Sequence, residues 1–393
     1  MEKLCNSELC TGCGACASVC PVGCIHMEPD NEGFLQPVVQ PEKCVGCNRC
    51  QLVCPIIGEY SLPDEQTDAY AAINLDEQVR YGSTSGGIFT LLCEKTLAQN
   101  GIVYGAAYDS DFTVRHCAVE KTEDLPKFRG AKYVQSCLGD TYVQVRKQLE
   151  KGRCVLFSGT PCQVGGLCSF LGKDYENLIL VDLICHGVPS PKVWQHYIGY
   201  RSAKDASGLK PARINLRSKE TGWPGYSIRF DYPDGQFYSA PNSQDPYLRG
   251  FVGNLYLRRS CYNCHFKGSS RQSDFTLGDY WGVWSQLPHY HDEKGTSLVL
   301  LHTDKAKRIW QSIEPQVRRE QVSCSSALVD NPSALVSEKI KDERQSFFER
   351  YLQEDFQELI SELLPISISV SKNSIITRII KKIWRVVKQI GSK

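Results

Sequence analysis

The chain has 393 residues, of which 41% are hydrophobic and 23% charged, a composition typical of globular proteins with two or three domains. Its formal net charge of +1 argues against a nucleic-acid partner, because there is no basic excess to meet phosphates. The start, MEKLCNSELC, lacks the basic and apolar regions of a secretory signal, and no apolar run reaches the roughly 18 residues of a membrane span. We therefore expect the 20 cysteines in a reducing cytoplasm, where fixed spacings favour metal ligands over disulfides.

Two copies of one cysteine pattern occupy the first sixty residues. CTGCGACASVCP (10–21) and CVGCNRCQLVCP (44–55) both read C-x2-C-x2-C-x3-C-P, the spacing of bacterial ferredoxins with two [4Fe-4S] clusters. In such ferredoxins the first three cysteines bind one cluster and the fourth binds the other. The predicted ligand sets are Cys10, Cys13, Cys16 and Cys54 for one cluster, and Cys44, Cys47, Cys50 and Cys20 for the other. Zinc knuckles are the alternative, although zinc sites usually combine two C-x2-C pairs. Cys5 and Cys24 fall outside the pattern and are predicted to be buried free thiols.

A small α/β unit is predicted at 68–147, after a polar linker at 61–68. Hydrophobic alternation predicts a strand over 69–75, a helix over 88–101 closed by Gly101, and a strand pair over 102–109 and 112–119. The stretch YGSTSGG (81–87) precedes the helix. Its hydroxyl and backbone N–H groups either bind a phosphate at the helix start or only cap the helix; the residues are Ser83, Thr84, Ser85, Gly86 and Gly87.

A second unit is predicted at 150–330. Residues 154–171 read as a strand, a Gly-Thr-Pro turn and a helix, with Thr160 as N-cap and Pro161 at the first helical position. An apolar strand follows at 177–184 and ends at Cys185. Two buried strands joined by a helix predict a parallel arrangement, whose ligand sites lie at the carboxyl ends of the strands. We therefore expect Cys162 and Cys185 at one edge of the sheet.

A lone C-x-x-C at Cys261 and Cys264 lacks two ligands. It follows a predicted hairpin at 226–240 and ends a helix predicted over 245–266, and a strand is predicted over 273–283. Cys162 and Cys185 are the best placed partners, which leaves a third [4Fe-4S] cluster, zinc and free thiols as open interpretations. With His265 the motif also fits c-type haem attachment, which we disfavour because that attachment normally occurs outside the cytoplasm.

Five segments resemble the beta subunits of the coenzyme factor-420 hydrogenases and dehydrogenases. They are YGSTSGG (81–87), RGAKYVQS (129–136), FSGTPCQ (157–163), VDLICHGVPS (181–190) and CYNCHF with SDFTLGDYWG (261–282). The resemblance spans roughly residues 68–285 and implies an FAD-containing oxidoreductase that exchanges a hydride with a deazaflavin or another organic acceptor. It also implies a third [4Fe-4S] cluster, with the ligands Cys162, Cys185, Cys261 and Cys264.

A flavin would couple the one-electron chemistry of clusters to the hydride chemistry of organic substrates. With the resemblance, the loop at 81–87 is favoured as its phosphate site or that of the coenzyme. Further candidates for contact with the cofactor are Lys132 as a cation, Tyr133 for stacking, Gln135 and Ser136 for hydrogen bonds, and Thr160 and Gln163 beside the ring. A solvated surface lysine is the alternative for Lys132. Arg217, Lys219 and Trp223 are candidates for binding an anionic substrate.

The end of the chain is basic and amphipathic. Seven Lys or Arg and no acidic residue follow Glu362, which leaves 38 basic against 44 acidic residues for the rest of the chain. Apolar residues from Ile376 to Ile390 fall on one helical face. This pattern is typical of a helix bound at the inner face of a membrane, and docking against the body or a partner subunit is the alternative.

The predicted fold class is therefore mixed, α+β or α/β: a ferredoxin-like two-cluster domain (1–60), a mixed α/β flavoprotein body (68–147 and 150–330), and a helical tail (331–393). The predicted function is an iron–sulfur flavoprotein oxidoreductase. Its partners would be an electron-carrier protein or redox subunit and a small organic substrate or deazaflavin. The alternatives are an electron-transfer subunit without a substrate site and a zinc-stabilised binding protein. No residue is identifiable as a general acid or base.

Overall fold

The computed structural model describes residues 4–58 and 67–365. Most of the predicted linker and all of the predicted basic helix of the tail lie outside these described residues. Within the described residues, no helix combines the length and hydrophobicity needed to cross a membrane.

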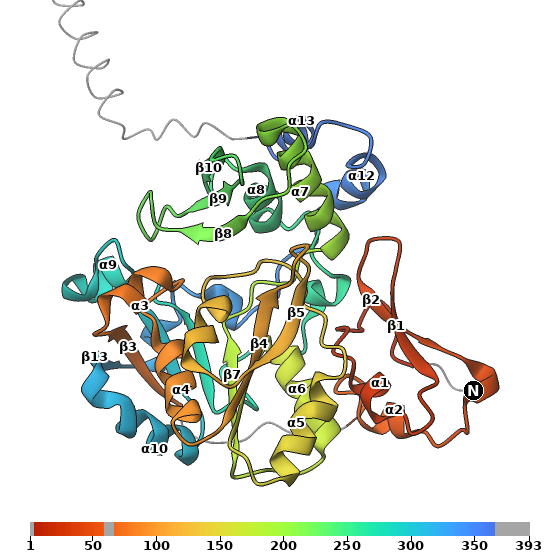
Figure 1. The fold of residues 1–393 in the computed structure, drawn as a ribbon, viewed down its shortest axis with the longest axis vertical. Helices are drawn as coiled ribbons and strands as arrows, with labels where there is room; N and C mark the ends of the chain where they lie inside the picture. The colour runs from red at the N-terminus through yellow and green to blue at the C-terminus, as the bar shows by residue number, and fades with distance from the viewer. Residues whose placement is uncertain (1–3, 59–66, 366–393) are drawn as a thin grey trace, which may run out of the picture.

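An eight-stranded sheet forms the centre of the body (Figure 1). Its strands are β3 (Asp68–Asn74), β4 (Ile102–Tyr108), β5 (Val114–Val119), β6 (Val155–Ser158), β7 (Leu178–Leu183), β11 (Phe275–Asp279), β12 (Ser297–Leu301) and β13 (Val317–Val322). The strand order is β13-β3-β12-β11-β7-β6-β4-β5, in which β11, β7, β6 and β4 run parallel and the other pairs are antiparallel. The predicted parallel pair β6–β7 is confirmed. One sheet runs across the boundary between the two units predicted from the sequence.

Helices cover both faces of this sheet. α4 (Ile88–Leu97) and α10 (Asp304–Ile313) pack on one face, and α5 (Thr141–Glu150) and α6 (Pro161–Leu171) on the other. Side chains alternate between the two cores as strand geometry requires: Leu156 faces α4, whereas Phe157 faces α6. The helix predicted over 88–101 ends earlier, at Leu97. Shorter helices in the body are α3 (Glu77–Gly82), α9 (Val283–Gln286), α11 (Cys324–Ala327), η2 (Thr122–Phe128), η4 (Pro288–Tyr290), η5 (Glu314–Gln316) and η6 (Pro332–Ala334).

The cysteine-rich N-terminal unit lies against α6 (Figure 1). It consists of α1 (Ala15–Val19), β1 (Ile25–Pro29), β2 (Leu35–Val39), η1 (Pro41–Lys43) and α2 (Arg49–Leu52), with β1 and β2 paired antiparallel. Ala15 is fully buried and belongs to the same hydrophobic core as Leu167 of α6. The unit is therefore part of the packed molecule.

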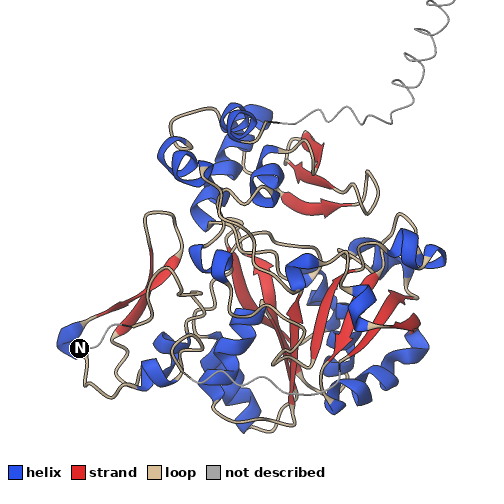
Figure 2. Ribbon diagram, turned by 180° about the vertical axis from the view of Figure 1, so that it is seen from behind, coloured by secondary structure: helices blue, strands red, loops and turns tan. Residues whose placement is uncertain are grey.

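A lobe beside the sheet completes the described fold (Figures 1 and 2). It contains α7 (Pro191–Ala206), β8 (Arg213–Ser218), β9 (Ser227–Asp231), β10 (Phe237–Pro241), α8 (Pro246–Val252), α12 (Glu343–Arg350) and α13 (Phe356–Leu363). The predicted hairpin is confirmed as the pair β9–β10. The helix predicted over 245–266 is wrong in length, because α8 ends at Val252 and Asn254 turns the chain with φ of 63°. Cys261 lies on a separate 3-10 helix, η3 (Arg259–Asn263).

Candidate functional site

Each of two cavities in the N-terminal unit is surrounded by cysteines from both repeats. The first cavity is lined by Cys10, Cys13, Cys16 and Cys54, together with Cys50. The second is lined by Cys20, Cys44, Cys47 and Cys50. Gly12, Gly14 and Gly46 have positive φ angles of 66° to 73°, a conformation that lets the loops turn tightly around the cavities. The individual cluster ligands stay a prediction.

The two cysteines outside the pattern lie beside the fourth cysteines of the repeats. Cys24 Sγ is 3.4 Å from Cys20 Sγ, and Cys24 lines the second cavity. Cys5 lines the first cavity, where its hydrogen bond to Cys54 lowers the pKa of the Cys54 thiol to about 6. Each cavity thus contains one thiol from outside the two repeats.

A third cavity brings together four cysteines that are distant in the sequence. Cys162 stands in the first turn of α6, Cys185 follows β7, and Cys261 and Cys264 lie on and after η3. α6 begins as the sequence predicts, since Thr160 and Gln163 form a capping box and Pro161 occupies the first helical turn. All four predicted ligands of the third cluster therefore line one cavity at the carboxyl ends of β6 and β7.

The four cysteines of this cavity are half-buried, and its lining is positively charged. Burial raises the pKa of Cys185 to about 11 and that of Cys261 to about 12, so as free side chains both are neutral thiols at pH 7. Arg258, Lys267 and Arg271 line the cavity too, whereas no Asp or Glu does. In the part of the chain that the structure describes, no three His, Cys, Asp or Glu side chains are close enough to share one metal ion. The four sulfurs here thus surround a space without converging on one point.

A larger cavity of about 310 Å³ lies next to the four cysteines. Its volume is within the range of about 300–1,000 Å³ usual for small-molecule sites. Nine of the eleven residues predicted for cofactor binding line it: Ser83, Thr84, Ser85, Gly87, Lys132, Tyr133, Ser136, Thr160 and Gln163. Gly86 does not line it, because its backbone packs against Ala72 and Ser297 of the sheet. Gln135 does not either, since its side chain donates to Thr11 O of the N-terminal unit, 3.0 Å away.

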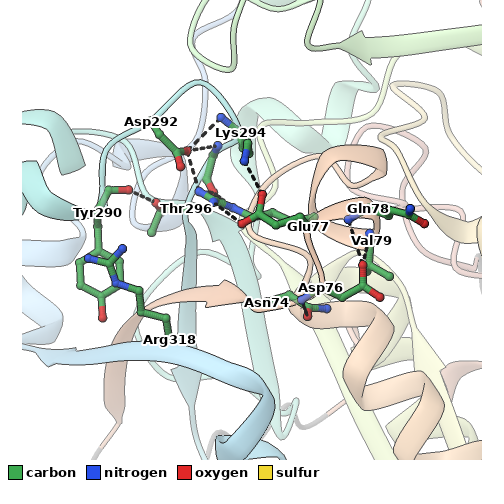
Figure 3. Close-up of polar contacts among 12 residues, drawn as sticks. Asn74, Asp76, Glu77, Gln78, Val79, Tyr290, Asp292, Lys294, Thr296 and Arg318 are labelled. Carbon is green, nitrogen blue, oxygen red and sulfur yellow. Dashed lines mark hydrogen bonds and ion pairs between the residues drawn. The ribbon is translucent and has the colours of Figure 1, made fainter.

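Polar contacts hold α3, the helix that precedes the loop at 83–87 (Figure 3). Asp76 caps α3 by accepting from the backbone N–H of Gln78 and Val79, 2.9 Å away in both cases. Figure 3 shows the ion pair that joins Glu77 to Lys294 on the opposite loop. The buried guanidinium of Arg80 donates to Asp292 Oδ1 at 2.6 Å. The loop itself is held by Ser83 Oγ, which donates to Val79 O of α3, and by Ser85 Oγ, which donates to Thr296 O, both at 2.7 Å.

Two further side chains of this wall were not identified from the sequence. Arg129 lines the cavity beside Lys132, and burial lowers the pKa of Lys132 to about 8. His116 of β5 also lines it, with its Nε2 at 2.9 Å from Ser158 O and its pKa lowered to about 4 by burial. Arg129 belongs to the segment RGAKYVQS, so its position in that segment could have identified it. Nothing in the sequence around His116 distinguishes it from an ordinary strand residue.

The residues predicted to bind an anionic substrate instead make internal contacts. Arg217 pairs with Asp279, with Nη2 at 3.1 Å from Oδ2, and donates to the Tyr133 hydroxyl at 3.2 Å. Trp223 Nε1 donates to Asp279 Oδ1 at 2.9 Å. Lys219 donates to Arg80 O at 2.9 Å. None of the three predicted residues lines the large cavity. These contacts hold the surroundings of the cavity together, and substrate binding by the three residues stays a prediction.

The four cavities form a row in which each adjoins the next. Cys50 and Leu4 line both cavities of the N-terminal unit. Thr11 lines both the Cys13 cavity and the cavity of the four distant cysteines. Val188 lines both that cavity and the large one. A continuous series of adjoining sites therefore leads from the outer end of the N-terminal unit to the edge of the sheet.

Comparison with known proteins identifies two regions. Residues 9–56 match the model of a 4Fe-4S dicluster domain, and residues 152–324 match the model of the C terminus of the coenzyme F420 hydrogenase/dehydrogenase beta subunit. No curated protein sequence matches the chain. A chain of the F420-reducing [NiFe] hydrogenase complex from Methanosarcina barkeri is similar at 18% identity and a TM-score of 0.45, over 77% of this chain and 91% of that one. Residues 152–324 are therefore similar to the C terminus of the coenzyme F420 hydrogenase/dehydrogenase beta subunit, and the chain is an oxidoreductase with an N-terminal 4Fe-4S dicluster domain.

Proposed function

We propose that the protein is an iron–sulfur flavoprotein that passes electrons between a one-electron carrier protein and an organic hydride donor or acceptor such as a deazaflavin. The observation that carries this proposal is the row of four adjoining cavities. The first two have the cysteines for clusters, the third has four further cysteines, and the fourth has the size and lining for an organic cofactor. Electrons can pass between iron–sulfur clusters and a flavin only when these groups lie close to one another, as neighbouring cavities would place them.

The residues of the third cavity fit a [4Fe-4S] cluster. Four cysteines would bind the iron atoms, and as thiolates they would give the site a net negative charge. Arg258, Lys267 and Arg271 supply the compensating positive charge from the wall. Val188 N donates to Cys261 Sγ at 3.5 Å, and Phe266 N donates to Cys264 Sγ at 3.4 Å. Such N–H contacts stabilise thiolate sulfur and are typical of cluster sites.

The large cavity fits the ring and phosphate groups of a flavin. A bound flavin would exchange single electrons with clusters and a hydride with organic molecules. The hydroxyl and N–H groups of 83–87 lie at the start of α4, where the helix dipole favours a phosphate. Arg129 and Lys132 add positive charge on the same wall. Thr160 and Gln163 line this cavity from the turn that also bears Cys162, so the ring would lie beside the third cluster.

Anaerobic purification followed by assays of iron, sulfide, zinc and flavin tests the proposal. Three clusters predict about twelve iron atoms and one flavin per chain. In Cys162→Ser, the iron content should fall to about eight atoms while the N-terminal clusters remain. One zinc atom in place of the third cluster, or a preparation without flavin, would contradict the proposal. A fully loaded protein that reduces no organic acceptor by itself would instead indicate an electron-transfer subunit.

A further inference from the structure

Arg258 lies between the N-terminal unit and the cavity of the four distant cysteines. It precedes η3, it is 1% exposed, and it lines the same cavity as Cys261. Its side chain crosses into the N-terminal unit, where Nε donates to Cys10 O at 2.6 Å and Nη2 donates to Leu35 O at 2.9 Å. Arg258 thus touches the backbone of a predicted ligand of one cluster and the cavity of another.

Two further contacts fix the guanidinium in this position. Nη1 donates to Gln135 Oε1 at 3.0 Å, and Gln135 in turn donates from Nε2 to Thr11 O at 3.0 Å. Gly12 lies directly against it, since a Cβ at that position would be 2.7 Å from Arg258 Nη1. A residue that only covered the interface would not need three hydrogen bonds and a glycine opposite its head group. The position of the charge is therefore built into both units.

The partners of Arg258 leave its charge without a carboxylate. In the described part of the chain its hydrogen bonds go to two backbone carbonyls and one amide oxygen. Two other buried arginines differ, since Arg217 faces Asp279 and Arg344 faces Glu32. Arg271, in the wall of the same cavity, resembles Arg258 in donating to the backbone carbonyls of Phe266 and Ala334. A buried guanidinium without a counter-charge destabilises its surroundings. A negatively charged group other than a side-chain carboxylate would therefore stabilise Arg258 in this position.

We infer that Arg258 is the shared electrostatic partner of two [4Fe-4S] clusters, the one at Cys10, Cys13, Cys16 and Cys54 and the one at Cys162, Cys185, Cys261 and Cys264. This inference rests on the proposed function. Reduction adds one electron, and hence one negative charge, to a cluster. A fixed positive charge between the two clusters favours their reduced forms, so it raises both reduction potentials. The cluster of Cys20, Cys44, Cys47 and Cys50 lies beyond the first and should feel the charge less.

A redox titration followed by EPR on the anaerobic full-length protein tests this role. Arg258→Gln removes the charge and keeps a polar side chain. We expect the equilibrium constant for reduction of both neighbouring clusters to fall at least tenfold, and a tenfold fall is about 59 mV for one electron. The cluster of Cys47 is the internal reference and should shift much less. Arg258→Lys keeps the charge but not the three hydrogen bonds, so the equilibrium constants for reduction should fall less than in Arg258→Gln.

The matched control is Arg259→Gln. Arg259 is adjacent in sequence, its side chain is 45% exposed, and it pairs with the exposed Glu8 and the partly buried Glu32. All three potentials should be unchanged in this variant. The EPR signals are assigned with Cys162→Ser, because the signal that is missing from this variant belongs to the third cluster.

Three outcomes separate the possible failures. A wild type without three clusters refutes the proposed function and with it the basis of this inference. A wild type with three clusters, and an Arg258→Gln variant with full iron and unchanged potentials, refutes the inference alone. If Arg258→Gln does not retain its iron, its potentials cannot be measured, and the Arg258→Lys variant then shows whether the charge of residue 258 is what matters. Full iron with equilibrium constants that fall less than about tenfold supports a role of charge, whereas loss of iron or a larger fall shows that only the geometry of the side chain matters.

Discussion

Replacing Gly166 with alanine tests whether the N-terminal unit is packed tightly onto the body. Gly166 lies within α6, and an added Cβ would be 2.8 Å from Cys13 Cβ and 2.9 Å from the Tyr142 hydroxyl. Both contacts are shorter than real Cβ contacts, so the helix or the loop of Cys13 must move. Crowding of this kind costs about 1–3 kcal/mol. Because Cys13 is a predicted cluster ligand, the displacement should also weaken the cluster that it helps to bind.

Gly199→Ala in α7 is the matched control, because nothing lies within 4 Å of the added methyl group. Both variants gain about 1 kcal/mol from the higher helix propensity of alanine. The difference in unfolding free energy between them therefore isolates the crowding, and Gly166→Ala should be about 1–3 kcal/mol less stable. Denaturant titration measures this difference, and the iron content should fall from about twelve toward about eight atoms. Equal stability and equal iron in the two variants would refute tight packing at Cys13.

Three further predictions concern the large cavity and its surroundings. Asp279→Asn leaves the buried Arg217 without its counter-charge. The unfolding free energy, measured by denaturant titration, should therefore fall by about 3–5 kcal/mol. A loss below about 1 kcal/mol would show that the ion pair contributes little. The pKa of His116 is lowered to about 4, so its contribution to stability is complete above about pH 6.5 and is lost as the pH falls toward 4. From pH 7 to pH 5 the wild type should lose about 2 kcal/mol more than His116→Gln, and parallel pH profiles would exclude this cause. Gly87→Ala should reduce the flavin content, because φ at Gly87 is 85° and an added Cβ would be 3.2 Å from its nearest neighbours. In the control Gly139→Ala the added Cβ meets nothing within 4 Å, so this variant should retain its flavin. Equal flavin content in the two variants would contradict a role of the loop in binding.

Local rules predicted the elements on which the site is built. Thr160, Pro161 and Gln163 define the start of α6 by capping chemistry, and the apolar run before Cys185 identifies a buried strand. Parallel pairing of β6 and β7 then suffices to bring Cys162 and Cys185 to one edge. The predicted mixed α/β class is confirmed for the same reason: short apolar strands alternate with amphipathic helices along much of the chain.

Long-range contacts could not be predicted in this way. Gln135 stands in a motif whose neighbours face the large cavity, yet it points toward the N-terminal unit, and only the packing of that unit decides this. The stretch around Asn254 has helical spacing, but the backbone turns there so that Arg258 can donate its hydrogen bonds to Val188 and the N-terminal unit. Arg217 carries a charge that sequence alone assigns equally well to a substrate or to Asp279. In each case the deciding neighbour is distant in the chain or belongs to another unit.

The shared core of α1 and α6 also has a kinetic consequence. Cys47 is exposed at the outer end of the row of cavities, while the large cavity opens at the other end. Under the proposed function, a carrier protein and an organic molecule would reach the protein at opposite ends of this row and would not compete for one surface. Raising the concentration of one reactant should therefore leave the other uninhibited, and turnover need not wait for a swing of the N-terminal unit between two docking positions.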